Sequence, residues 1–192
     1  MQRLGLFGGA FNPVHLGHLL VAESALEELK LDKLFFIPAW RSPFKQNDDT
    51  APAELRLRWL RLALAGQARY EIDCQEIQRG GVSYTIETAR WYAKHFPNTE
   101  LVYLVGADNV PKLNEWREAA ELSKLLKFAA VPRPGQAPPA FPKPFHGSAL
   151  KGFPLDISSS EIRTRVKNDF SIRNLVPPFV ADAIRDSGAY RR

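Results

Sequence analysis

The sequence predicts an α/β fold in which a doubly wound, mostly parallel sheet is followed by a small C-terminal helical part. Short apolar runs alternate with segments of helical periodicity from residue 3 to residue 131. The run Leu101–Val105 is apolar throughout, which is typical of a strand buried on both faces of a parallel sheet. The first apolar run leads through two glycines into a helical segment. At 192 residues, the chain is expected to form a single domain over 1–192.

The individual elements follow from the same patterns. Apolar runs predict strands over 3–7, 33–37, 70–77, 101–105 and 127–131. Apolar residues at helical spacing predict helices over 16–29, 53–65, 84–95, 114–126, 157–166 and 178–186. In the helix over 53–65, the side chains of Arg56, Arg58 and Arg61 are expected mostly on the outer face. Residues 132–154 hold seven of the fifteen prolines and predict a loop, so 157–192 would form the C-terminal helical segment.

The composition excludes several classes of protein. The net charge of +5 is modest and no Lys- or Arg-rich block occurs, so nucleic-acid binding is not expected. A single cysteine, Cys74, rules out an internal disulfide and a cysteine metal cluster, and suits a reducing compartment. No apolar run approaches membrane length, and the N-terminus lacks a secretory signal pattern. We therefore expect a cytoplasmic protein that does not bind membranes.

Residues Gly8 to Pro13 have the composition of a phosphate-binding turn. Gly8 and Gly9 are expected to let the backbone adopt positive φ and approach a ligand closely. Asn12 is a candidate N-cap for the next helix, and Pro13 suits its first position. The start of that helix would offer free N–H groups and a positive dipole end to an anion. A Gly-Gly turn alone is common, so this stretch needs support from elsewhere.

Two histidines in the next helix strengthen the interpretation. His15 and His18 are three residues apart and therefore share one helical face. A half-built zinc site is the alternative, but no third ligand is visible in the sequence. Gly17 lies between them, where glycine costs roughly 1 kcal/mol relative to alanine in a helix. We interpret Gly17 as a place where a flat ligand lies against bare backbone.

A second candidate site lies near the other end of the chain, between Asp156 and Arg163. Ser158 is followed three residues later by Glu161, as in a capping box, so helix capping alone explains part of the pattern. Arg163 lies three residues after Ser160 and thus on the same face as the free N–H groups. Hydroxyls, backbone donors and a guanidinium together form a second potential phosphate site.

Together the two sites resemble the nucleotidylyltransferase superfamily, with its H-x-G-H motif at His15–His18 and its late S-x-S/T-x-x-R motif at Ser158–Arg163. Within it, the chain is most similar to bacterial nicotinate-mononucleotide adenylyltransferases. The supporting stretches are Gly8–Pro13, Ser83–Thr85, Gly106–Asp108, Trp116–Arg117 and Val131–Gly135. The chain departs from the family pattern with Asn12 in place of aspartate and Ser160 in place of threonine. It also has Ser42-Pro43-Phe44-Lys45 where the family has Pro-Pro-His-Lys.

The resemblance implies a Rossmann-like fold and transfer of AMP from ATP to nicotinate mononucleotide, with release of pyrophosphate. It implies catalytic roles for His15, His18, Lys45 and Arg163. ATP would be bound by Gly8, Gly9, Ala10, Phe11, His15, Gly17, His18, Ser158, Ser160 and Arg163. Mg²⁺ would arrive with ATP and be held through its phosphates, with no ligand from protein side chains.

The resemblance also implies where the acceptor binds. Asp108 would bind a ribose hydroxyl, and Trp116 would stack on the pyridine ring. Thr85, Gly106 and Arg117 would complete this site through side chain or backbone. The simpler alternatives are a core role for Trp116, a helix cap for Thr85 and a turn residue for Asp108.

Alternative functions remain at this stage. Related enzymes of the superfamily use nicotinamide mononucleotide or pantetheine phosphate as acceptor, or transfer cytidylyl groups. A non-catalytic nucleotide sensor would keep the phosphate-binding residues without turnover. The sequence leaves open whether the chain is a monomer or a homo-oligomer, whether residues 132–154 close over substrate, and how strongly the deamidated acceptor is preferred.

Overall fold

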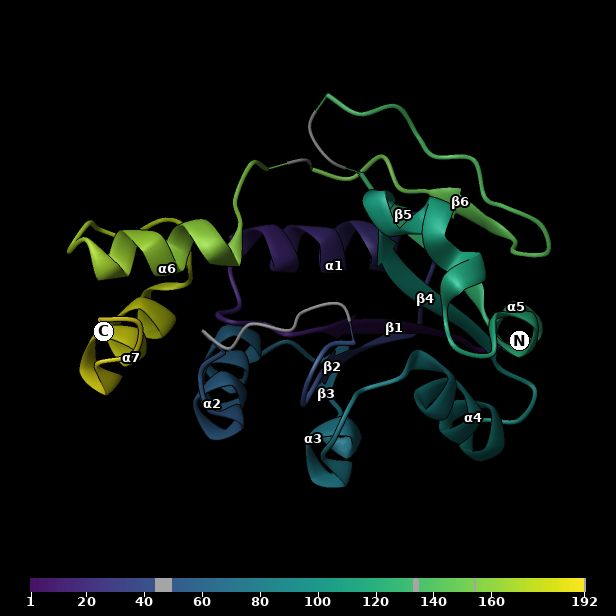
Figure 1. Cartoon of the computed structure of the whole chain (residues 1–192), viewed down its shortest axis with the longest axis horizontal. Helices are drawn as coiled ribbons and strands as arrows, with labels where there is room; N and C mark the ends of the chain where they lie inside the picture. Colours follow the sequence, from purple (N-terminus) through teal and green to yellow (C-terminus); the bar gives the residue numbers. More distant parts are fainter. Residues whose placement is uncertain (44–49, 133–134, 154, 192) are drawn as a thin grey trace.

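The strands form one six-stranded sheet in which every neighbouring pair is parallel (Figure 1). The computed structural model describes residues 1–43, 50–132, 135–153 and 155–191. The strand order is β3-β2-β1-β4-β5-β6, so the order reverses between β1 and β4. Ligands of such doubly wound sheets bind beyond the carboxyl ends of the strands at this reversal. The strands are β1 (Arg3–Gly9), β2 (Lys33–Pro38), β3 (Tyr70–Ile72), β4 (Glu100–Gly106), β5 (Lys127–Val131) and β6 (Gly147–Ala149).

Helices cover both faces of the sheet, and each face has its own apolar core. One core joins Phe36 and Leu104 of the sheet to buried residues of α1, α2, α6 and α7. The other joins Leu6 and Val105 to buried residues of α4, α5 and the 3₁₀ helix η1. The predicted doubly wound α/β fold is therefore confirmed. The helices are α1 (Leu16–Glu28), α2 (Ala53–Leu64), α3 (Gln75–Arg79), α4 (Thr85–His95), η1 (Ala107–Glu115), α5 (Ala119–Leu125), α6 (Ser159–Lys167) and α7 (Pro178–Ser187).

Three predicted elements differ from the structure. The strand expected over 70–77 ends at Ile72, because the chain turns at Asp73, whose carboxylate accepts the Gln75 N–H at 2.9 Å, and α3 begins at Gln75 with Cys74 as its N-cap. The helix expected over 114–126 is shorter: Pro111 lies within η1, and only Ala119–Leu125 is α-helical. The loop expected over 132–154 contains a short edge strand, β6.

The turn between β1 and α1 also differs from the prediction. Helix α1 begins at Leu16 with His15 as its N-cap, so Asn12 does not cap the helix and Pro13 precedes it. Gly8 and Gly9 belong to β1 and do not have positive φ. Their need for glycine is instead steric. A Cβ on Gly8 would overlap the Tyr103 hydroxyl of β4, and one on Gly9 would lie 3.2 Å from the Phe11 ring.

Arg56 is the clearest reversal of a predicted orientation. It was expected on the outer face of α2, but it is only 2% exposed. Its guanidinium donates to the carbonyl oxygens of Ala10 (2.7 Å), Ala39 (2.8 Å) and Ala51 (3.0 Å). Ala10 lies in the segment after β1, and Ala39 and Ala51 lie at the two ends of the β2–α2 connection, so the buried cation ties these two loops together at one edge of the sheet. Burial lowers the pKa of Arg56.

No helix in the described part of the chain is long and apolar enough to span a membrane.

Replacing Gly8 with alanine should destabilise the fold. The new methyl group would overlap the Tyr103 hydroxyl, whose ring is held about 6.0 Å from the rings of both Trp116 and Phe128. We expect Gly8→Ala to lower the free energy of unfolding by about 1–3 kcal/mol in urea denaturation. Gly106→Ala, at the end of the adjacent strand, is the control, since its Cβ would meet nothing nearer than Asn109 Nδ2 at 3.6 Å. Equal stability of both variants would contradict this steric account.

Candidate active site

His15 and His18 lie one above the other at the start of α1. Their ring centroids are 3.7 Å apart and the rings are inclined by 34°. The His15 backbone N–H donates to His18 Nδ1 at 3.2 Å. Because a backbone N–H is always a donor, Nδ1 must be unprotonated, and His18 carries its proton on Nε2. His18 can therefore offer one N–H donor from Nε2.

His15 is neutral at physiological pH for a different reason. The residue is 7% exposed, and its Nδ1 is buried without a hydrogen-bond partner in the described part of the chain. Burial lowers the pKa of His15 to about 4, because the protonated ring loses its hydration. Gly17 permits this arrangement: a Cβ there would lie only 3.0 Å from His15 Nδ1. The structure thus gives Gly17 a steric role against a protein ring, where a flat ligand had been expected.

Helix α6 is held against the β1–α1 turn by two side chains. Arg163 Nη1 donates to the Asn12 carbonyl at 3.0 Å, and Ser159 Oγ donates to the Pro13 carbonyl at 2.9 Å. Ser158 is the N-cap of α6 and accepts the Glu161 N–H at 3.1 Å, as its sequence pattern predicted. In Figure 1, α1 and α6 begin next to each other and run in opposite directions. The positive ends of both helix dipoles therefore converge.

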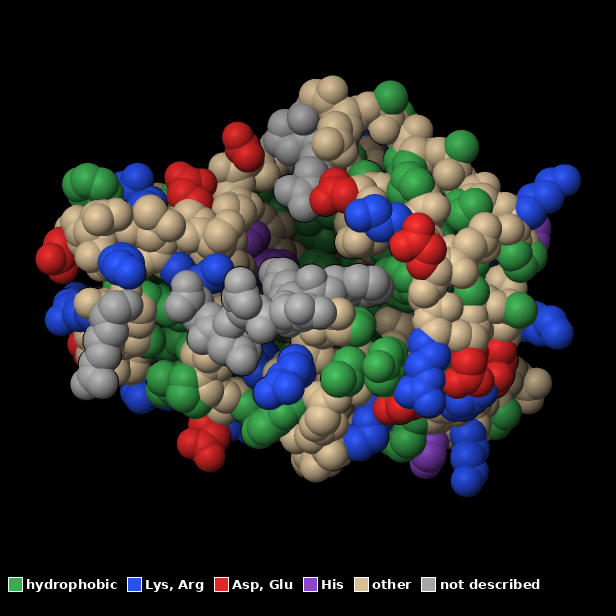
Figure 2. Space-filling view, viewed as in Figure 1, with side chains coloured by type: hydrophobic (Ala, Val, Ile, Leu, Met, Phe, Trp, Pro, Cys, Tyr) green, Lys and Arg blue, Asp and Glu red, His purple; other side chains and the backbone are tan. Residues whose placement is uncertain are grey.

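The two histidines and Arg163 line one cleft of about 540 Å³. Figure 2 shows this face with histidine side chains in a central hollow and Lys and Arg side chains toward α6. The remaining ATP-site candidates in the cleft are Gly17, Ser158 and Ser160. Two sequence motifs more than 140 residues apart thus form one surface with donors for an anion. Further lining residues come from β1, α1 and the segment before α6, namely Phe7, Val21, Phe153, Leu155 and Asp156.

The other predicted phosphate-site residues lie beside this cleft. Phe11 has a φ of +46° and is 1% exposed, and its ring centroid is 5.0 Å from that of His18. The Phe11 ring therefore packs against the ring of His18. Gly8, Gly9 and Ala10 line a neighbouring cavity and not the histidine cleft. Lys45, the remaining catalytic candidate, lies outside the described residues.

That neighbouring cavity, of about 160 Å³, lies at the carboxyl ends of β1 and β4. Gly106 lines both the cavity and the histidine cleft, so the two spaces adjoin at the end of β4. Trp116 lines the cavity and packs edge-on against Tyr103, with centroids 6.0 Å apart. Gly8, Gly9 and Gly106, at the carboxyl ends of two neighbouring strands, therefore converge on one cavity.

Three predicted acceptor residues do not line this cavity. Thr85 begins α4, and its side chain hydrogen-bonds the Tyr103 hydroxyl. Asp108 is exposed in the first turn of η1. Arg117 is exposed, with its guanidinium 4.6 Å from the centre of the Tyr84 ring and 3.5 Å from the Glu87 carboxylate. Their roles toward the acceptor stay predictions.

The cavity also contains Glu76 and Asn109, which the sequence did not single out, and Ser83 of the Ser83–Thr85 stretch. Glu76 is 6% exposed, lines the cavity and accepts a hydrogen bond from Thr88 at 2.5 Å. Burial raises the pKa of Glu76. Ser83, also in the cavity wall, accepts the Trp40 N–H at 3.0 Å and so fixes the segment after β2. Asn109 completes this group. No periodicity or motif marks Glu76 or Asn109, because they come together with Ser83 only through the strand order.

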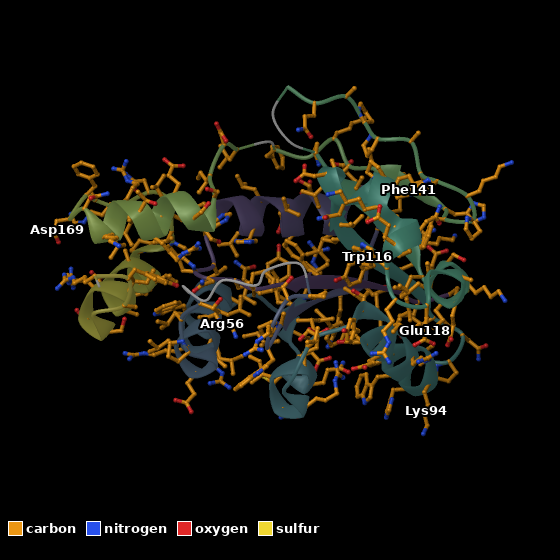
Figure 3. All side chains as sticks on the ribbon, viewed as in Figure 1. Arg56, Lys94, Trp116, Glu118, Phe141 and Asp169 are labelled. Carbon is orange, nitrogen blue, oxygen red and sulfur yellow. The ribbon has the colours of Figure 1, made fainter. Side chains whose placement is uncertain are left out.

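Figure 3 shows Arg56 on α2 and Trp116 beside β4 and β5, so the two labelled side chains bracket the carboxyl edge of the sheet. Arg56 fixes the loops of Ala10 and Ala39, which also border the cavity. Hydrogen bonds of Arg56 therefore fix one wall of the cavity, and ring packing of Trp116 against Tyr103 fixes another.

Comparison with known proteins places this site in a family. Residues 6–165 match the family model described as "Cytidylyltransferase-like". A protein of Opitutus terrae named "Probable nicotinate-nucleotide adenylyltransferase" is 40% identical over 193 residues, covering 99% of this chain and 98% of its own length. A protein of Thermus thermophilus with the same name is 40% identical over 195 residues, covering 99% and 100%. The chain belongs to the nicotinate-nucleotide adenylyltransferase family.

Solved structures agree on the fold of this adenylyltransferase family member. The Plasmodium falciparum nicotinic acid mononucleotide adenylyltransferase complexed with APC matches with a TM-score of 0.80 at 15% identity, covering 100% of this chain and 98% of that chain. The same enzyme complexed with NaAD matches with a TM-score of 0.77 at 16% identity and the same coverage. At this identity, the likeness shows a shared fold.

His15 should make this adenylyltransferase family member sensitive to acid in a defined pH window. Its pKa is about 4 when folded and about 6.5 when unfolded, so between these values the unfolded chain binds the proton and the folded chain does not. Stability should therefore fall as pH drops from about 6.5 to 4, by roughly 1 kcal/mol per pH unit from this residue. Urea denaturation across pH 4–7 measures the slope. His15→Gln should flatten it, whereas His95→Gln, at an exposed position, should not; identical slopes in wild type and His15→Gln would contradict the assignment.

Proposed function

We propose that this chain joins the AMP moiety of ATP to nicotinate mononucleotide, giving nicotinate adenine dinucleotide and pyrophosphate. The observation that carries the proposal is the adjoining pair of spaces: the cleft of His15, His18 and Arg163 shares Gly106 with the cavity lined by Trp116. One space offers donors for a polyphosphate, and the other offers an aromatic wall for a ring. Relatives at 40% identity over nearly the whole chain carry the name of this activity.

The histidine cleft suits the triphosphate of ATP. His18 Nε2–H, the Arg163 guanidinium and the converging starts of α1 and α6 all favour negative charge. Ser158 and Ser160 add hydroxyl groups at the start of α6. We assign His18 to the phosphate that reacts and Arg163 to the departing pyrophosphate. Lys45 remains our candidate for a further phosphate contact.

The reaction requires positioning more than proton transfer. An oxygen of the acceptor's 5′-phosphate attacks the α-phosphorus of ATP and forms the new P–O bond. The bond from the α-phosphorus to the bridging oxygen breaks, and its electron pair leaves with pyrophosphate. The nucleophile is already an anion, so the protein supplies alignment and stabilises the charge that develops on the phosphoryl oxygens.

The cavity beside β4 is our proposed acceptor site. Trp116 provides an aromatic surface for the pyridine ring, and the backbone of Gly8 and Gly9 in β1 lines the same cavity. Because Gly106 borders both spaces, a phosphate attached to a ring in this cavity would point toward the histidine cleft. Thr85, Asp108 and the backbone near Arg117 remain our candidates for the ribose and the ring carboxylate.

Mg²⁺ fits this site as an ion carried by ATP. Among the described residues, no group of three or more His, Cys, Asp or Glu side chains could hold a metal ion. The oxygen-rich wall of the cleft, with Asp156 and the serines of α6, suits a hard cation that keeps most of its ligands from water and phosphate. Bound Mg²⁺ would neutralise phosphate charge during transfer.

Replacing His18 with alanine should remove most of the activity without unfolding the chain. The variant loses the Nε2–H donor, and loss of one such donor at a reacting oxyanion costs about 10²–10³ in kcat. Pyrophosphate release under saturating ATP measures the effect, with circular dichroism as the check on folding. His95→Ala, on the exposed end of α4, is the matched control and should keep wild-type rates. A His18→Ala enzyme with near-normal turnover would refute the assigned role.

The choice of acceptor tests the proposed function directly. Pyrophosphate release is measured in parallel with nicotinate mononucleotide, nicotinamide mononucleotide and pantetheine phosphate, each with MgATP. We expect the highest kcat/KM with nicotinate mononucleotide. A higher value with either other acceptor would assign the chain to a different reaction of the superfamily, and tight ATP binding with no release would indicate a sensor.

A further inference from the structure

Asn12 is a meeting point of three distant parts of the chain. The residue is 5% exposed in the turn between β1 and α1. Its side-chain Oδ1 accepts the Ala51 N–H at 3.0 Å and the Tyr190 hydroxyl at 2.5 Å. Its backbone carbonyl accepts Arg163 Nη1 at 3.0 Å. One residue therefore connects the segment before α2, the end of the chain and the arginine of the phosphate cleft.

Tyr190 reaches Asn12 from the C-terminal end through a constrained turn. After α7, the backbone has positive φ at Gly188 (+65°) and again at Tyr190 (+67°). A bulky residue rarely adopts this conformation, so other contacts must hold it. The Tyr190 ring lies 5.7 Å from the ring of Trp59, and the hydroxyl bonds Asn12. Burial raises the pKa of Tyr190 and keeps the hydroxyl a donor.

Tyr190 does not line the histidine cleft. It borders a separate cavity of about 590 Å³, together with Ser160, Arg163 and Lys167. Arg163 borders both spaces, and hydrogen bonds connect Tyr190 to Arg163 through Asn12. Any effect of Tyr190 on ATP would therefore be indirect.

We propose that Tyr190 is a positioning residue for adenylyl transfer. Its hydroxyl fixes the Asn12 side chain from one side while the Ala51 N–H fixes it from the other. The Asn12 carbonyl is thereby held where Arg163 donates to it, and the guanidinium stays aimed at the phosphate cleft. Without the Tyr190 hydroxyl, the β1–α1 turn is less constrained, and the Asn12 carbonyl is no longer held in the position where Arg163 donates to it. The inference rests on the proposed function in taking ATP as the ligand of that cleft.

Tyr190→Phe tests the proposal, because phenylalanine keeps the ring against Trp59 and removes only the hydroxyl. We expect the affinity for the Mg²⁺ complex of a non-hydrolysable ATP analogue to fall about 5- to 20-fold by calorimetry, as for loss of one buried hydrogen bond that orients a charged group. The kcat/KM for ATP should fall by a similar factor, while the KM for nicotinate mononucleotide changes less than about twofold.

Tyr70→Phe is the matched control. The Tyr70 hydroxyl of β3 donates to Glu23 of α1 at 2.5 Å and not to Asn12, so this variant loses an equally short hydrogen bond at another place. It should leave both ATP parameters unchanged even if its stability toward urea falls as much as that of Tyr190→Phe. A Tyr190→Phe enzyme with wild-type ATP binding, or with equal losses for ATP and acceptor, would overturn the proposal.

A double-mutant cycle checks the route through Asn12. Asn12→Ala removes the acceptor, so adding Tyr190→Phe to it should reduce ATP affinity by less than a further twofold. Independent, additive losses would overturn the proposal. The affinity for the ATP analogue also separates the role of Tyr190 from the proposed function. A wild-type chain that binds the ATP analogue but does not use nicotinate mononucleotide refutes the proposed function, while the Tyr190→Phe affinity still decides the role of Tyr190.

Discussion

Two backbone carbonyl oxygens hold the candidate site together. Those of Asn12 and Pro13, in the turn after β1, accept hydrogen bonds from Arg163 and Ser159 of α6. These contacts join residues 151 and 146 positions apart in the chain. They bring the start of α6 to the start of α1 and place the guanidinium in the cleft of the histidine pair. The rest of the C-terminal segment serves this docking, since α7 packs in the same core and the turn after it brings Tyr190 to Asn12.

The docked helices produce an electrostatic surface with little formal charge of its own. His15 is neutral because it is buried, and His18 presents a neutral N–H because its other nitrogen accepts a backbone proton. Attraction for a polyphosphate then comes from Arg163, hydroxyl groups and two helix starts. A site built in this way is oriented before ligand arrives.

Much of this arrangement could be predicted from local sequence. Periodicity indicated most elements, the strand–helix alternation gave the doubly wound class, and Ser158 was correctly expected to cap α6. Other features depend on distant partners. Nothing in the pattern of α2 distinguishes Arg56 from Arg58, because the acceptors of Arg56 are three carbonyls in the β1–α1 and β2–α2 loops. Gly8 looked like a turn residue but is required by Tyr103 of a non-consecutive strand. Asn12 looked like a helix cap, and its actual partners lie 39 and 178 positions away.

The most direct test is a crystal structure of the chain with Mg²⁺ and a non-hydrolysable ATP analogue. The account predicts one polyphosphate chain in the cleft, with phosphate oxygens about 3 Å from both His18 Nε2 and the Arg163 guanidinium. The adenosine would occupy the same cleft between α1 and the segment before α6. A triphosphate that contacts one of these groups while the other faces solvent, or that binds elsewhere on the molecule, would contradict it.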